Sequence, residues 1–131
     1  MKNFSDLPDT DLQISIHLAA HHGWPQIQVT VNHHRAITVI PAATGATLRY
    51  SVPCQDALVI SLEFQGPENS SALIQSIQVD DFDFVPGYTH WATYHGTPTT
   101  HLDQPGSWQI RLEQPFYCWL HHVTGQGWLF D

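Results

Sequence analysis

The chain has 131 residues, with four basic against twelve acidic side chains and a formal charge of −8 at pH 7. This length suits one domain spanning residues 1–131. An acidic surface without a Lys/Arg cluster repels phosphate backbones, so nucleic acid is excluded as an expected partner.

The N-terminal residues 1–11 are acidic and are interrupted by Pro8. A signal peptide has a basic start and an apolar run, so none is expected here, and we expect a flexible acidic N-terminus instead. Elsewhere the apolar runs are far shorter than the ~20 residues that cross a bilayer. The sequence therefore predicts no membrane span.

Short runs of alternating or β-branched residues follow one another along the chain, with Pro, Gly, Asn and Asp between them. Helical periodicity is almost absent. The predicted strands cover residues 12–18, 26–32, 36–40, 47–52, 57–64, 73–84, 107–113 and 116–120. Several short strands at this spacing indicate an all-β protein, which we predict to be an antiparallel β-sandwich of jelly-roll type.

The alternation separates buried from exposed faces, because successive side chains of a strand point to opposite sides of the sheet. Ile27, Val29 and Val31 share one face of their strand. The same pattern groups Leu58, Ile60, Leu62 and Phe64 on one strand, and Trp108, Ile110 and Leu112 on another. We expect these residues, together with Phe116, to form the core.

Residues 85–106 have no clear period and are predicted to form a long loop that carries Tyr88, Trp91 and Tyr94. Loops of this length are often functional. Exposed aromatic rings can stack on sugar rings or anchor a protein interface. A cover folded back over the core is the alternative for the loop. Trp128 and Phe130, at the C-terminal end, are further interface candidates.

Charged residues make up only 12% of the chain, against a usual ~25%. The polar residues are instead Thr, Gln, Ser, Asn and ten His. Charge is depleted at the cores of interfaces, so this composition favours an assembling protein and, with it, a homo-oligomer.

Two stretches of the sequence resemble known families. The segments WPQIQVTVN, TLRYSV, ALVISLEFQGPENS and LIQSIQVDDFDF resemble the small calcium-dependent carbohydrate-binding β-sandwiches, notably the xylan-binding modules. The segment SWQIRLEQPFYCWLHHVTGQGWLF resembles the ending of small tailed-phage virion proteins built on that sandwich. Together the two resemblances cover roughly residues 24–130.

The first resemblance implies a calcium site around residues 63–71, where Glu63, Glu68 and Asn69 supply oxygen atoms. Calcium takes six to eight oxygen ligands, and this segment offers few of them. Asp81 and Asp83, in the only acidic cluster, are the other candidate ligands. We therefore expect no cofactor, with calcium as the candidate metal if one binds.

No motif for catalysis is present: the chain lacks a GxSxG elbow and a glycine-rich phosphate loop. Cys54 and Cys118 form no CxxC pair and are expected to be buried. They do not indicate whether the protein works in a reducing or an oxidising compartment. A hydrolase using Asp81 or Asp83 remains a third hypothesis, behind two non-enzymatic ones.

The leading hypothesis from sequence is a structural or decoration protein of a tailed-phage virion, in the capsid or the tail. It would bind itself and other virion proteins, and would be located in the virion. The alternative is a carbohydrate-binding module that recognises a host or plant-type polysaccharide through the loop aromatics.

Overall fold

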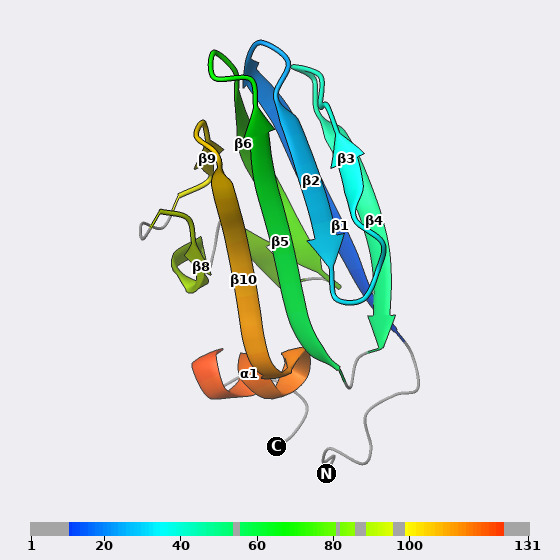
Figure 1. The fold of residues 1–131 in the computed structure, drawn as a ribbon. Coiled ribbons are helices and arrows are strands. Elements are labelled where there is room, and N and C mark those ends of the chain that lie inside the picture. The colour runs from blue at the N-terminus through cyan, green and yellow to red at the C-terminus, as the bar shows by residue number, and fades with distance from the viewer. Residues whose placement is uncertain (1–10, 54–55, 81, 86–88, 96–98, 125–131) are drawn as a thin grey trace.

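The computed structural model describes residues 11–53, 56–80, 82–85, 89–95 and 99–124. They form two antiparallel sheets packed face to face (Figure 1). One sheet has the order β4-β1-β6-β7, with β9 also paired to β6, and the other has the order β3-β2-β5-β10-β8. The elements are β1 (Asp11–His22), β2 (Gln26–Val31), β3 (Ile37–Val39), β4 (Ala46–Pro53), β5 (Ala57–Gly66), β6 (Ser71–Val79), β7 (Phe82–Val85), η2 (Thr89–Trp91), β8 (Ala92–Thr93), β9 (His101–Leu102), β10 (Gly106–Pro115) and α1 (Phe116–Thr124).

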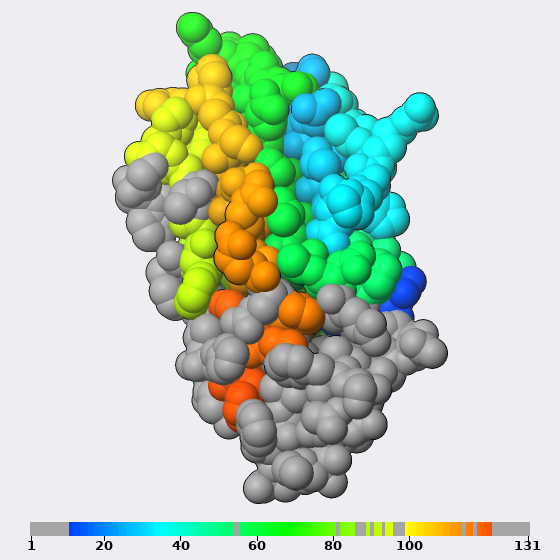
Figure 2. Space-filling view, turned by 60° about the horizontal axis from the view of Figure 1, so that its bottom comes forward, coloured from blue at the N-terminus to red at the C-terminus, as the bar shows by residue number. Residues whose placement is uncertain are grey.

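The predicted all-β antiparallel sandwich is confirmed. From β3 to β10 the chain crosses repeatedly between the sheets, because β4, β6, β7 and β9 belong to one sheet and β5, β8 and β10 to the other. Jelly rolls are built from crossings of this kind. Figure 2 shows the outer face of the second sheet, where β2, β5 and β10 lie side by side.

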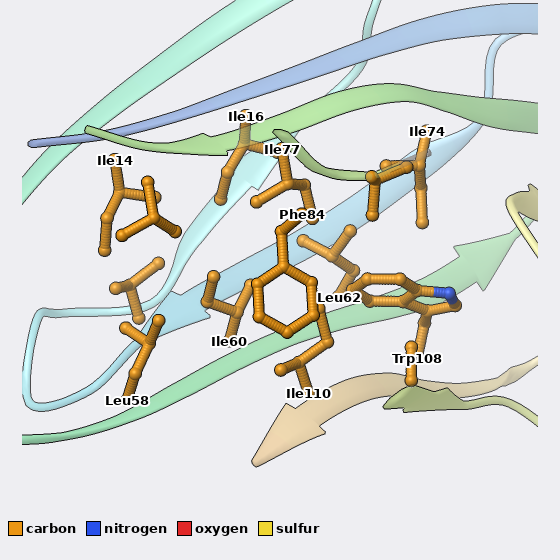
Figure 3. Close-up of a cluster of buried hydrophobic side chains, with 14 of the residues drawn as sticks. Ile14, Ile16, Leu58, Ile60, Leu62, Ile74, Ile77, Phe84, Trp108 and Ile110 are labelled. Atoms are coloured by element: carbon orange, nitrogen blue, oxygen red, sulfur yellow. The ribbon is translucent and has the colours of Figure 1, made fainter. Parts of the chain in front are cut away.

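The core lies between the sheets and follows the predicted alternation. Ile27, Val29 and Val31 on β2 are fully buried, and so are the inward residues of β5 and β10. Trp108 and Phe84 are among the largest side chains without exposed surface, and Figure 3 shows them pointing into the same layer. Each such side chain contributes roughly 1.5–3 kcal/mol of transfer free energy.

The C-terminal strand predicted at residues 116–120 is wrong. Residues Phe116–Thr124 form helix α1, which lies at the end of the sandwich where β10 finishes (Figure 1). Phe116, Trp119 and Leu120 are buried, which is the i, i+3, i+4 spacing of one helical face. A five-residue apolar run carries too little periodicity to distinguish a strand from a helix.

The strand predicted at 73–84 is also wrong, because the chain reverses and forms two antiparallel strands, β6 and β7. Asp80 adopts a left-handed backbone, with φ of 52°. Its amide donates to the Gln13 carbonyl at 2.7 Å, and its Oδ1 accepts from the Gln13 amide at 2.9 Å. Asp accepts this conformation more readily than most residues, which explains the turn.

The predicted loop at 85–106 contains more structure than expected. Within it, η2, β8 and β9 are short elements, and β8 joins one sheet while β9 joins the other. Strands of two residues leave no period in a sequence, so the alternation test could not find them.

Candidate functional site

An open depression of about 530 Å³ lies at the end of the sandwich opposite helix α1. Its lining comes from the end of β1, the β5–β6 turn, and β9 with the residues that follow it. The lining residues are His22, Glu68, Asn69, Ser70, Ser71, His101, Asp103, Gln104 and Pro105. The described lining is thus rich in amide, carboxylate, imidazole and hydroxyl groups and contains no lysine or arginine.

Strand register brings these residues together. His22 on β1 is paired with Ser71 on β6, and Leu73 on β6 is paired with His101 on β9. Three strands that are far apart in sequence therefore end at the same place. The signal for this arrangement is long-range pairing, which a short-range pattern in the sequence does not contain.

The β5–β6 turn is built by local hydrogen bonds. The Ser70 amide and Ser70 Oγ both donate to the Pro67 carbonyl, at 3.0 and 2.6 Å. Gly23, in the β1–β2 turn, packs directly on this turn with φ of +63°, and an added Cβ would lie 3.2 Å from Ser70 Cβ. Glycine fits there because it tolerates both the left-handed backbone and the close approach.

This contact places the neighbouring Trp24 at the same end of the molecule. Trp24 is 71% exposed, the largest exposed fraction among the described large apolar residues. No pattern in the sequence singled out Trp24, which stands between Gly23 and Pro25 ahead of β2. A large apolar ring held in water is the informative exception to burial, since a Trp side chain normally contributes strongly to a core or an interface.

Three histidines cluster beside the depression. The ring of His21 lies 4.3 Å from that of His22 and 5.2 Å from that of His101, in both cases edge to face. The carboxylates of Glu68 and Asp103 line the same depression. This mixture of imidazole donors and acceptors with carboxylate and amide groups suits a ligand with several hydroxyl groups.

Two polar atoms of the lining are buried and lack a hydrogen-bond partner among the described residues, Ser71 Oγ and His101 Nε2. A buried polar group without a partner costs roughly 1–3 kcal/mol of folding free energy, so two such groups in one depression are uncommon without a functional reason. Ser71 Oγ also has no bond to an imidazole within the described chain. Among the described residues, Ser71 Oγ therefore lacks the hydroxyl–imidazole bond that activates a serine nucleophile.

The candidate aromatics of the 85–106 segment differ in their surroundings. Trp91 is 41% exposed, and its ring lies edge to face with Trp119 at 5.4 Å. Tyr94 is only 5% exposed, so its ring is buried, as the alternative of a cover folded back over the core predicts. Its ring packs with the core, and its hydroxyl accepts a hydrogen bond from the Gln104 amide. Tyr88, Trp128 and Phe130 lie outside the described residues.

The candidate metal ligands are dispersed. Glu68 and Asn69 line the depression, whereas Glu63 is exposed on β5, opposite Ser107 of β10. Asp83 lies on β7, where its Oδ1 accepts from Gln78 Nε2 at 2.8 Å. Asp81 is outside the described residues. No group of three or more His, Cys, Asp or Glu side chains in the described part is arranged to hold a metal ion.

Two further depressions lie at the other end of β2. Asn32, His33 and Asp56 line both, with Val52 and Pro53 in one and Arg111 in the other. Both oxygen and nitrogen of the Asn32 side chain are bonded to β5 backbone. Asn32 therefore serves the fold at this end.

Cys118 is a free, buried thiol, and burial raises its pKa above the ordinary value. Its low exposure and protonated state are the opposite of what a reactive cysteine needs. Cys54 lies outside the described residues. Across the part of the chain that the structure covers, no helix has the length and apolar character needed to span a membrane.

No family model and no curated protein matches the chain. Among solved structures, it is similar to the selenomethionine form of vCBM60, from work on circular permutation as an evolutionary link between two families of calcium-dependent carbohydrate-binding modules. The TM-score is 0.56 at 11% identity, over 77% of this chain and 91% of that one. At such low identity the likeness shows the fold alone. This chain has a β-sandwich like that of a carbohydrate-binding module.

Proposed function

We propose that the protein is a non-catalytic carbohydrate-binding module whose ligand is a polysaccharide. The observation that carries the proposal is the open polar depression at the end of the sandwich, the same end at which Trp24 is exposed. The alternative reached from sequence is therefore preferred over a virion role. Its site, however, moves from the aromatic loop to the strand ends.

The chemistry of the depression matches a sugar. Hydroxyl groups need mixed donors and acceptors, which Asn69, Gln104 and His101 supply together with the carboxylates. The apolar C–H face of a sugar ring packs on an aromatic face, which Trp24 offers with most of its surface free. The described lining of this open depression contains no lysine or arginine, which fits an uncharged polysaccharide that extends past the depression at both ends.

The test is retention of the protein in native gels that contain soluble xylan, galactan or mixed-linkage β-glucan. Trp24→Ala and Gln104→Ala should each weaken retention about tenfold, equivalent to ~1.4 kcal/mol. Ile37→Ala is the matched control, because Ile37 is 45% exposed on the edge strand β3 and does not line the depression. Trp91→Ala separates this site from the aromatic segment.

No retention by any of these polysaccharides, or unchanged retention in both Trp24→Ala and Gln104→Ala, would overturn the proposal. Loss of retention in Trp91→Ala alone, with an unchanged melting temperature, would move the site back to the 85–106 segment.

Calcium does not enter this mechanism. The described side-chain oxygen donors at the depression are two carboxylates, two amides and two serine hydroxyls, divided between the β5–β6 turn with the start of β6 and the residues after β9. Calcium takes six to eight oxygen ligands, and no three of the described His, Cys, Asp or Glu side chains are grouped to hold a metal ion. The residues present do not fit a calcium site of their own, and the binding proposed above depends on hydrogen bonds and ring stacking.

Assembly into a virion stays a prediction, since nothing in the comparisons concerns a phage particle. One observation favours association with another protein: Ile37 on the edge strand β3 and Ile40 directly after it are 45% and 54% exposed. Exposed apolar residues along a sheet edge invite pairing. Light scattering tests this, with a discrete oligomer expected for the wild type and a monomer for the Ile37→Lys/Ile40→Lys variant.

A further inference from the structure

The Tyr94 hydroxyl forms two hydrogen bonds with a single residue. It accepts from the Gln104 amide at 2.9 Å and donates to the Gln104 carbonyl. The ring itself is buried, so it holds the hydroxyl in one place. Gln104 is exposed and lines the depression between Asp103 and Pro105. A buried side chain is thus hydrogen-bonded to the backbone of Gln104, which with Asp103 and Pro105 forms one wall of the depression.

The two residues belong to different sheets. Tyr94 directly follows β8, which pairs with β10, whereas Gln104 follows β9, which pairs with β6. The hydroxyl therefore joins the edge of one sheet to the edge of the other. Since each short strand has only two residue pairs, its own ladder gives the wall little stiffness.

Other contacts fasten the start of the same segment. Trp108 Nε1 donates to the Thr99 carbonyl at 2.6 Å, and the Ile74 amide donates to the Thr100 carbonyl at 2.8 Å. These bonds hold residues 99–100, ahead of His101. After His101, the backbone of Gln104 is held by its two hydrogen bonds to the Tyr94 hydroxyl.

We propose that Tyr94 is a positioning residue, which fixes the wall of the depression through Gln104 without touching the ligand. The inference rests on the proposed carbohydrate function. When the wall is already rigid, the entropy cost of ordering it falls in folding and not in binding. Loss of that rigidity therefore lowers the affinity for the ligand. Because Gln104 is exposed, water can replace the lost bonds, and the fold survives removal of the hydroxyl.

The test compares Tyr94→Phe with Tyr50→Phe. Both changes remove one hydroxyl from a buried tyrosine, and the Tyr50 hydroxyl has no hydrogen-bond partner in the described chain. Tyr50 lies on β4 and does not line the depression. Amide hydrogen exchange is measured across the chain, and binding is measured in native gels with xylan, galactan and mixed-linkage β-glucan.

In Tyr94→Phe, exchange at residues 102–106 should rise about tenfold while exchange in β1, β2 and β5 stays as in wild type. Affinity for the retained polysaccharide should fall about tenfold. Tyr50→Phe should change neither quantity. A merely structural role of Tyr94 would raise exchange throughout the core and would lower the melting temperature.

Wild-type exchange at residues 102–106 in Tyr94→Phe would overturn the positioning role, whether or not a polysaccharide binds. Faster exchange with unchanged affinity would overturn its link to the site. If the wild type binds none of the three polysaccharides, the proposed function fails, while the exchange comparison still decides whether Tyr94 holds the wall.

Discussion

The Asn32 side chain binds two backbone groups of β5: Oδ1 accepts from the Val59 amide at 2.7 Å, and Nδ2 donates to the Ala57 carbonyl at 3.0 Å. Asn32 has a left-handed backbone, with φ of 49°. It therefore ties the β2–β3 turn to the start of β5. No feature of the residues around it distinguished this asparagine from an ordinary turn residue.

Asn32→Ala should lower the free energy of unfolding by about 2 kcal/mol, because two hydrogen bonds are lost at roughly 1 kcal/mol each. Asn32→Asp keeps the Oδ1 acceptor and should lose about half as much. Urea denaturation measures both. Equal effects of the two variants would show that the amide donor to Ala57 contributes nothing.

Ser71→Ala should keep or raise stability while weakening polysaccharide retention. The Ser71 hydroxyl is buried without a described partner, and its removal relieves a desolvation cost of about 1 kcal/mol or more. Ser70→Ala is the matched comparison for stability alone, since Ser70 Oγ bonds the Pro67 carbonyl and its loss should cost about 1 kcal/mol. Destabilisation by Ser71→Ala would mean that this hydroxyl serves the fold.

Gly106→Ala should destabilise the protein by about 1–3 kcal/mol. Gly106 has φ of +153°, and an added Cβ would lie 2.7 Å from His95 Nε2. Adding His95→Ala to this variant removes the clash and leaves the backbone strain. Thermal unfolding of the single and double variants separates the two costs, and full rescue would assign the whole effect to the clash.

Cys118 should react slowly with a thiol reagent in the native state and quickly after unfolding. Burial raises its folded pKa, so the folded state retains a proton that the unfolded chain releases. The resulting stability is complete below the unfolded pKa and declines as pH rises through the folded value. The Cys54→Ser variant removes the other thiol of the chain, so the labelling rate reports on Cys118 alone. Native labelling at the rate of the unfolded chain would contradict burial of this thiol.

A chelator should leave both polysaccharide retention and melting temperature unchanged. The described residues provide no group of three or more His, Cys, Asp or Glu side chains placed for a metal. The measurement compares EDTA-treated protein with protein in millimolar calcium. Retention that requires added calcium would show that ligand and protein complete a metal site together, and the mechanism proposed above would be wrong.

Much of the fold follows from the sequence, because inward and outward residues alternate along each long strand. Val29, Ile60 and Ile110 are buried as that period requires, on three neighbouring strands. The reversal at Asp80 and helix α1 were missed for different reasons. A left-handed aspartate resembles any other in a run of acidic residues, and a short apolar run fits either a strand or a helix.

The sequence by itself determined the class of fold and the composition of the core, since both depend on a short-range pattern of apolar residues. Only the tertiary structure decided which polar residues meet at the depression. His22, Ser71 and His101 are brought together by antiparallel pairing of β1, β6 and β9. It also decided that Tyr94 is buried and Trp24 exposed. Those outcomes depend on long-range register and on the close approach of Gly23 to Ser70, which have no local signature.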